Sequence, residues 1–211
     1  MGKNIPRIFI VDDDEKFSKS LSRLVKSIGF DVETFLCAQE FLERKHYKGV
    51  SCLLLDVRMP GLTGPDLQEE LKNRSIDMPI VFLTDHGDVP TGVKAMKDGA
   101  VDFLPKPVEE KKLFEAIDHA LDRDAQLKKS TREIEKAKSL VASLTPREQE
   151  VMRWLITGML NKQVARYLGA TERTIKAHRS QVMHKLGVVS VAELVRLAQK
   201  ADIPPAKRSP R

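Results

Sequence analysis

Five short apolar runs, separated by amphipathic stretches, fill the first half of this 211-residue sequence. Each run is mostly continuous and rich in Ile, Val, Leu and Phe, which is typical of parallel strands that are covered on both faces. The stretches near 15–28, 38–46, 64–74, 88–98 and 109–121 have the character of helices. This alternation predicts an α/β domain with a doubly wound, five-stranded parallel sheet. The runs are RIFIV (7–11), VETF (32–35), SCLLLD (51–56), PIVFLT (79–84) and VDFL (101–104).

Polar residues stand where these runs end. They are Asp12 and Asp13 after the first, Asp56 and Thr84 at the ends of the third and fourth, and Lys106 after the fifth. Ligands bind at the carboxyl ends of parallel strands, so we expect these side chains to share one crevice. The four consecutive acids from Asp12 to Glu15 would repel one another without a compensating charge. A Mg²⁺ ion prefers carboxylate oxygens and also binds phosphate, so it would provide that compensation.

The residue types in this crevice indicate phosphoryl chemistry. A carboxylate such as that of Asp56 can attack phosphorus and form an aspartyl phosphate. Mg²⁺ and a lysine would neutralise the charge that develops on the transferring group. Asp14 and Glu15 are interpreted differently, as capping the first helix, because the positive N-terminus of a helix favours anions.

Charge is distributed unevenly along the chain. Residues 1–121 contain 17 Lys and Arg against 21 Asp and Glu, a net charge of −4, whereas residues 122–211 contain 19 against 9, a net charge of +10. The basic half is expected to face a polyanion. No apolar run approaches the roughly 20 residues that a membrane helix needs. We therefore expect no membrane contact. Cys37 and Cys52 are interpreted as reduced core residues, which predicts a cytoplasmic protein.

Composition divides the chain into four segments. We expect a first domain over 5–122, a charged helical linker over 123–143, a helical domain over 144–201 and a disordered basic tail over 202–211. Apolar residues recur every seven positions towards and through the linker, but the companion positions are mostly polar. A solvated linker and a helix that couples two copies of the chain both remain open. The recurring residues are Leu113, Ala120, Leu127, Ile134 and Val141.

Helix signals are dense after Ser143. Thr145, Pro146 and Glu148 predict a capping box that starts a helix. NKQVARYLG and TERTIKAHRSQVMHKLG then predict two helices of roughly 8 and 16 residues, broken at LGAT, which is the layout of a helix-turn-helix. SVAELVRLAQK predicts a fourth helix. The second helix of the pair can therefore enter the major groove of double-stranded DNA.

The motifs FIVDDDEKF, LLLDVRMPGLTGPDL, PIVFLTDHGD and DFLPKPV resemble the receiver domain of two-component response regulators, a flavodoxin-like fold, over residues 5–122. The resemblance implies that Asp56 is the phosphoacceptor and that Mg²⁺ is held by Asp12, Asp13, Asp56 and the backbone carbonyl of Arg58. It also implies that Thr84 is the switch hydroxyl, that Lys106 pairs with the phosphoryl group and that Phe103 is the rotating aromatic. Asp85 departs from the family pattern of Ala or Gly, and it either repels the phosphoryl group or faces solvent.

The segment LTPREQEVMRWLITGMLNKQVARYLGATERTIKAHRSQVMHKLGV resembles the four-helix DNA-binding domain of the LuxR/NarL/FixJ regulators. The resemblance implies dimerisation on DNA, with half-sites roughly 34–36 Å apart. It places Lys176, Ala177 and Ser180 at base-reading positions, and Ser180 stands where some relatives carry a basic residue. Arg173 lies on the same exposed side of the helix, and the residues placed near phosphates are Asn161, Lys162, Thr171, Thr174, His178 and Lys185.

Together the two resemblances predict a DNA-binding transcription regulator that a partner sensor histidine kinase switches by Mg²⁺-dependent phosphorylation of Asp56. Beyond this self-modification the protein is not expected to be an enzyme. An alternative is an Mg²⁺-dependent phosphatase or phosphotransferase, but such enzymes typically have a general acid two residues after the nucleophile, where this chain has Arg58. A third hypothesis is a receiver that only dimerises and is never phosphorylated, and it rests on Asp85.

Overall fold

The structure, a computed structural model, describes residues 5–85 and 89–207 and divides into two compact units, one ending at Lys128 and the other beginning at Lys129. The first unit contains a parallel sheet with the strand order β2-β1-β3-β4-β5. Each strand begins and ends within one residue of its predicted run, so the predicted five-stranded sheet is confirmed. The strands are β1 (Arg7–Val11), β2 (Asp31–Phe35), β3 (Ser51–Asp56), β4 (Ile80–Thr84) and β5 (Asp102–Pro105).

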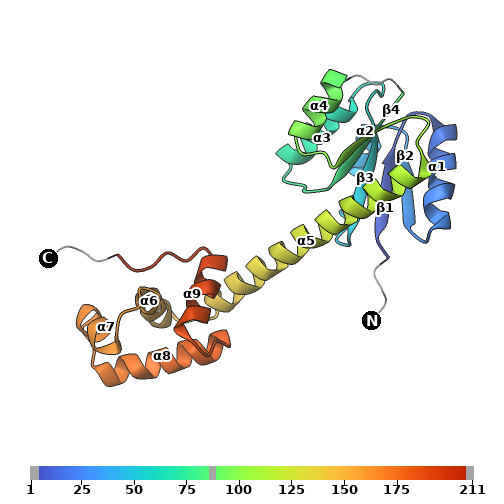
Figure 1. Ribbon diagram of the computed structural model, residues 1–211. Coiled ribbons are helices and arrows are strands. Elements are labelled where there is room, and N and C mark those ends of the chain that lie inside the picture. Colours follow the sequence, from blue (N-terminus) through green and yellow to red (C-terminus); the bar gives the residue numbers. More distant parts are fainter. Residues whose placement is uncertain (1–4, 86–88, 208–211) are drawn as a thin grey trace. The chain divides into compact units, whose positions relative to one another are not determined.

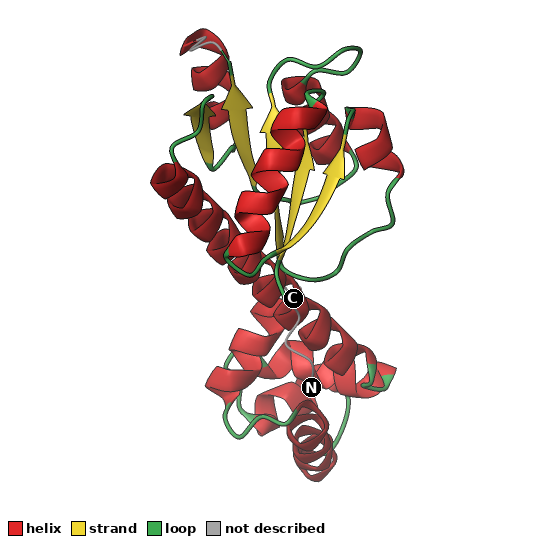
Figure 2. Ribbon diagram, turned by 90° about the vertical axis from the view of Figure 1, so that its right-hand side faces the viewer, coloured by secondary structure: helices red, strands yellow, loops and turns green. Residues whose placement is uncertain are grey.

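Helices cover both faces of this sheet (Figures 1 and 2). Helices α1 and α5 pack on the face that contains Ile10 and Leu54, and α2, α3 and α4 pack on the face that contains Leu53 and Phe82. Successive residues of a strand point to opposite faces and both faces are covered, so all six residues of β3 are buried and its central residues Cys52 to Leu55 are apolar. The helices are α1 (Glu15–Ser27), α2 (Ala38–Glu43), α3 (Gly64–Asn73), α4 (Val89–Lys97) and α5 (Glu110–Ala142).

Helix α5 continues without a break beyond residue 122, where the linker is predicted to begin (Figure 1). The carboxylate of Asp124 is fully buried, accepts a hydrogen bond from the Ser51 backbone N–H at 2.7 Å and forms an ion pair with Lys128 at 2.5 Å. The Lys128 ammonium also donates to the carbonyl oxygen of Gly49. These contacts attach α5 to the start of β3, so the first unit uses the helix as far as Lys128.

The seven-residue repeat along α5 serves two separate cores. Leu113 and Ala120 are buried in the first unit, and Val141 is buried in the second. The side chains of Leu127 and Ile134 are 39% and 41% exposed. The buried members are thus explained by packing within the chain, and a solvated linker and a helix that couples two copies both stay open for the exposed members.

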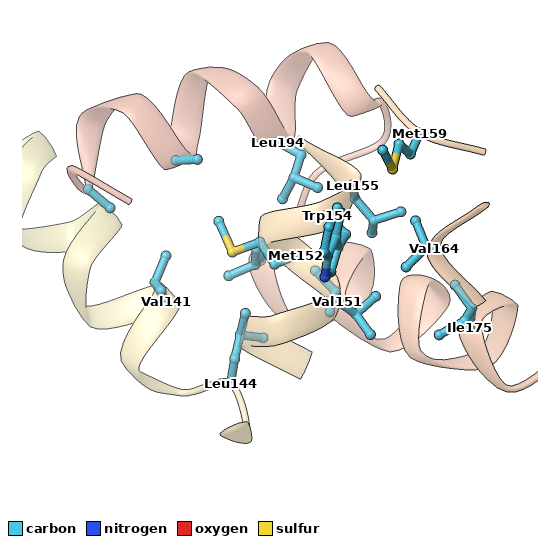
Figure 3. Packing of buried hydrophobic residues seen from close by; sticks show 14 of the residues in the cluster. Val141, Leu144, Val151, Met152, Trp154, Leu155, Met159, Val164, Ile175 and Leu194 are labelled. Atoms are coloured by element: carbon cyan, nitrogen blue, oxygen red, sulfur yellow. The ribbon is translucent and has the colours of Figure 1, made fainter. Parts of the chain in front are cut away.

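The second unit adds helices around one apolar core. Thr145 caps the first of them and forms the predicted capping box with Glu148. Figure 3 shows side chains from all of these helices converging, among them Val151, Val164 and Leu194, which are buried. The helices are α6 (Pro146–Leu155), α7 (Asn161–Leu168), α8 (Glu172–Leu186) and α9 (Val191–Lys200).

The described part of the C-terminal tail differs from the predicted disorder. Ile203 and Ala206 pack against the core of the second unit, and the Ala206 backbone N–H donates to the carbonyl oxygen of Arg153 at 3.0 Å. These two apolar side chains give residues 202–207 a surface to bury, which a purely basic tail would lack. Residues 208–211 of the predicted tail lie outside the described residues.

Candidate phosphoacceptor pocket and DNA interface

The sheet brings three of the predicted pocket residues into direct contact. Asp12 follows β1, Asp56 is the last residue of β3 and Lys106 follows β5. The Nζ atom of Lys106 lies 2.7 Å from Oδ2 of Asp12 and 2.7 Å from Oδ1 of Asp56. Residues that are distant in the sequence meet here because parallel strands align their carboxyl ends at one edge of the sheet.

The three groups form a buried charge cluster with one cation for two anions. Asp12 and Asp56 are 0% and 3% exposed. Burial raises the pKa of both carboxyl groups, and the hydrogen bond and charge of Lys106 oppose this effect. Burial lowers the pKa of Lys106, but its bonds to the two carboxylates outweigh burial and leave that pKa raised. The pocket therefore has an excess of negative charge that a further cation would compensate.

The remaining predicted metal ligands lie around this cluster. Asp13 is exposed beside it, and the Arg58 backbone N–H donates to Oδ2 of Asp56 at 2.8 Å. Across residues 5–85 and 89–207, no three acidic, cysteine or histidine side chains gather closely enough to hold a metal ion. Mg²⁺ usually binds through one or two carboxylates and keeps several waters, so the oxygens of Asp12 and Asp56 suit it in kind.

Two of the four consecutive acids at the end of β1 have distinct contacts: Asp12 faces the pocket and Asp14 caps α1, whereas the assignment of Asp12 and Asp13 to Mg²⁺ stays a prediction. Asp12 accepts a hydrogen bond from the Asp14 backbone N–H at 3.0 Å and faces the pocket. Asp14 is the N-cap of α1, and its side chain accepts from the backbone N–H groups of Lys16 and Phe17, which lowers its pKa. Glu15 begins the helix. The acids thus perform at least two separate structural tasks.

The loop after Asp56 depends on two glycines. Gly61 has a φ of 79°, a left-handed conformation that favours glycine. Gly64 starts α3 directly against the end of β3, and a side chain at this position would collide with the carbonyl oxygen of Asp56. Thr63 caps α3 in a capping box with Asp66. This arrangement explains why small and capping residues follow the candidate phosphoacceptor.

The candidate switch residues lie on the neighbouring strands. Thr84 is buried at the end of β4, and Phe103 is partly buried in β5 beside Phe82, with ring centroids 6.2 Å apart. The Asp85 carboxylate is 68% exposed, and its Oδ2 lies 3.8 Å from Nζ of Lys106. Asp85 is therefore largely exposed and lies near the lysine to which the family resemblance assigns the phosphoryl group.

One residue of the pocket was missed by the sequence analysis. The Nζ atom of Lys106 lies 4.4 Å above the ring centroid of Phe17, a cation–π arrangement. Phe17 is in the first turn of α1, where it reads as an ordinary apolar residue. A clue was available, because α1 begins only two residues after Asp13, a predicted metal ligand.

In the second unit, α7 and α8 form a helix-turn-helix. Gly169 between them has a φ of 59° and ends α7 in a left-handed conformation. Thr171 caps α8 by accepting the Thr174 backbone N–H at 3.1 Å, and its hydroxyl group is 2.8 Å from that of Thr174. Ile175, Val182 and Leu186 are buried. The opposite side of α8 is thereby left at the surface.

The structure leaves most of the predicted DNA contacts at the surface. His178 and Asn161 are half-buried, and Oδ1 of Asn161 accepts a hydrogen bond from Nη1 of Arg179 at 3.3 Å. The exposed residues are Lys162, Thr171, Arg173, Thr174, Lys176, Ala177, Ser180 and Lys185.

Lys185 differs from the other predicted contacts because its cation is already paired. Its Nζ atom lies 2.8 Å from Oε2 of Glu148, a buried side chain in the capping box of α6. The hydrogen bond from Lys185 lowers the pKa of Glu148. Lys185 thus connects α8 to α6 within the unit, and a phosphate would have to compete with this carboxylate.

Comparison with known proteins identifies both units. The family described as response regulator receiver domain matches residues 8–118, and the bacterial regulatory proteins of the luxR family match residues 142–198. Among the described residues no helix is long and apolar enough to span a membrane.

Several relatives match this chain over most of their own length. The chain is 44% identical to nodulation protein W of Bradyrhizobium diazoefficiens, over 93% of this chain and 86% of that protein. It is 43% identical to the transcriptional regulatory protein FixJ of the same organism, over 93% and 96%. The low-resolution structure of the response regulator StyR matches with a TM-score of 0.85 and 47% identity, over 93% of this chain and 99% of that one. The chain belongs to the two-component response regulators of the NarL/FixJ type, which are transcription regulators with a receiver domain and a LuxR-type DNA-binding domain.

Proposed function

We propose that Asp56 accepts a phosphoryl group from a sensor histidine kinase in the presence of Mg²⁺, and that this phosphorylation switches DNA binding. A carboxylate oxygen of Asp56 attacks phosphorus, the bond between phosphorus and the donor imidazole nitrogen breaks, and the imidazole leaves. The observation that carries this proposal is the single ammonium of Lys106, 2.7 Å from both Asp12 and Asp56.

The side chains of the pocket support this chemistry in distinct ways. The ammonium of Lys106 is positioned to neutralise a phosphoryl oxygen on Asp56, and the Arg58 backbone N–H fixes the second oxygen of that carboxylate. Asp12, Asp13, Asp56 and the carbonyl of Arg58 would hold Mg²⁺, which supplies charge neutralisation when it is bound. The hydroxyl group of Thr84 would then bond to the phosphoryl group.

Activation is proposed to act through dimerisation. Rearrangement of Thr84 and Phe103 would alter the surface of the first unit and favour a homodimer, which binds two half-sites on double-stranded DNA. The side chains of Lys176, Ala177 and Ser180 would then face the bases. The residues near phosphates would be Asn161, Lys162, Thr171, Thr174, His178 and Lys185. We place the protein in the cytoplasm.

The test uses the full chain with acetyl phosphate as the donor. Phosphorylation is measured by mass spectrometry, oligomeric state by sedimentation and DNA binding by fluorescence anisotropy, each with Mg²⁺ and with EDTA. We expect all three signals to respond in the wild type with Mg²⁺ and none to respond in Asp56→Asn. Equal responses of the two proteins would contradict the proposal. Sustained turnover of a free phosphorylated substrate would favour a phosphatase instead, and silence of both proteins would favour a receiver that only dimerises.

A further inference from the structure

The ring of Phe103 lies against a helix at a position that has no side chain. Phe103 is paired with Phe82 across β4 and β5. On the side of α4 the ring faces Gly92, which is buried. A Cβ atom added to Gly92 would lie 3.3 Å from Cδ1 and 3.3 Å from Cε1 of the ring, which is tighter than an ordinary van der Waals contact. The ring therefore occupies the space that a side chain at residue 92 would need.

Backbone conformation does not explain the glycine at this position. Gly92 lies inside α4 and is not one of the glycines with a positive φ. Glycine in a helix interior is less favourable than alanine, because it loses more conformational freedom on folding. The compensating gain visible in the structure is the space given to the ring of Phe103.

The ring of Phe103 beside Gly92 lies on the same face of the sheet as Thr84, the candidate switch residue. Phe82 and Thr84 are two residues apart on β4, so their side chains project from the same face of the sheet, and Phe103 projects from that face beside Phe82. Thr84 is buried at the end of the strand. A movement of Thr84 towards a phosphoryl group on Asp56 would vacate volume on this face. Interiors are close-packed, so a vacated volume favours movement of the partly buried ring into it.

We propose that Gly92 is a positioning residue for Phe103 and that its missing side chain lets the ring lie against α4 in its partly buried position, from which it moves on activation. This inference rests on the proposed phosphorylation of Asp56. A methyl group at residue 92 would require the ring to move away from α4 by a few tenths of an ångström, off the position that its rotamer now gives it. The substitution therefore opposes the phosphorylated state while leaving the pocket of Asp12, Asp56 and Lys106 intact.

Gly92→Ala in the full chain is the test, because alanine strengthens the helix and the fold is not put at risk. In protein labelled with fluorinated phenylalanine, with the signal of Phe103 identified by its loss in Phe103→Leu, we expect that signal to move away from its wild-type position. The acetyl phosphate concentration for half-maximal dimerisation in Mg²⁺ should rise about threefold or more, the factor expected for one strained side-chain rotamer.

Two controls separate a positioning role from a general effect on α4. Lys94→Ala changes an exposed neighbour on the same helix and should match the wild type in both measurements. In a Phe103→Ala background, Gly92→Ala should leave the donor response unchanged. An unmoved fluorine signal, or an altered donor response that persists without the ring, would overturn the proposal.

Failure of the proposed function can be recognised separately. If wild type and Asp56→Asn respond alike to acetyl phosphate, phosphorylation of Asp56 is not the switch. The fluorine signal is recorded without any donor, so it still decides whether Gly92 determines the position of the ring. A signal that moves in Gly92→Ala supports the positioning role, and a signal that does not move contradicts it.

Discussion

Replacing Lys106 by methionine should destabilise the first unit strongly at neutral and higher pH. The substitution keeps a long buried side chain but removes the ammonium 2.7 Å from carboxylate oxygens of both Asp12 and Asp56. At an effective dielectric constant of about 20, each contact corresponds to roughly 6 kcal/mol of gross Coulomb attraction. Much of this attraction is offset, because the ammonium no longer has to be desolvated. Removing one partner of a buried ion pair costs about 3–5 kcal/mol, and we expect a loss in that range at about pH 8.

The loss should depend on pH because the two acids can take up protons. Burial already raises the pKa of Asp12 and Asp56, and the variant removes the lysine that opposes this effect. A carboxyl group with a raised folded pKa binds its proton more readily in the folded state. Such a carboxyl group therefore adds to the free energy of unfolding below its unfolded pKa of about 4. This added stability is lost as the pH rises through the folded pKa. The deficit of the variant should be small near pH 4 and grow towards pH 8.

The measurement is urea unfolding followed by circular dichroism and by tryptophan fluorescence at pH 5 and pH 8. Trp154 is the sole tryptophan and lies in the core of the second unit, so its fluorescence should report the same transition in both proteins. Lys112→Met is the matched control, since it removes an exposed lysine paired with Glu109 at 2.9 Å and should have no measurable effect. Millimolar Mg²⁺ should restore part of the loss by binding the folded pocket. Equal stability of Lys106→Met and wild type at pH 8, or a deficit of the same size at both pH values, would refute the reasoning.

Further predictions concern both units. Gly64→Ala should lower the unfolding free energy of the first unit by about 1–3 kcal/mol in urea titrations, because the methyl group collides with a backbone carbonyl; an unchanged midpoint would contradict this. Glu148→Gln should lower the urea midpoint of the Trp154 transition at pH 7. Because the folded pKa of Glu148 is lowered, its contribution exists above the unfolded pKa and is lost as pH falls, so the difference from wild type should shrink towards pH 3. Lys162→Ala removes an exposed cation placed near a phosphate, so it should weaken binding to duplex DNA and reduce the slope of log K against log salt by about 0.9, whereas Lys185→Ala should change that slope less, because its cation is already paired; equal slopes in the two variants would argue against the assignment. Asp85→Ala should change the half-life of the aspartyl phosphate if its carboxylate acts through Lys106, and an unchanged half-life would remove Asp85 from the mechanism.

Much of the candidate site could be predicted because its determinants are local. Asp56 and Thr84 end apolar runs whose length and composition identify buried parallel strands, and the alignment of such strands brings their ends together. Helix starts are indicated by Thr145 with Glu148 at the start of α6 and by Thr171 before α8. These side chains form hydrogen bonds within the first turn of their helices. These features follow from the pattern of hydrophobic residues along the sequence and from hydrogen bonds between residues within one helical turn.

The features that could not be predicted depend on contacts between distant residues. The charge pattern after residue 122 reads as a solvated linker, and only the burial of Asp124 against Ser51 assigns that stretch of α5 to the first unit. Lys185 reads as a free cation on a basic helix, and only its approach to Glu148 reveals that it is paired. In both cases the sequence contains the charged residue but not the identity of its partner.

The parallel sheet, the capped helices and the polar residues at the strand ends could be predicted from the sequence. Hydrophobic patterns and helix caps depend only on residues that are close together in the chain. Tertiary structure decided that one ammonium, from Lys106, lies between Asp12 and Asp56 and above the ring of Phe17. It also decided that Phe103 fills the space left by Gly92. Those arrangements depend on which side chains meet when distant helices and strands pack together. Patterns among neighbouring residues do not specify these contacts.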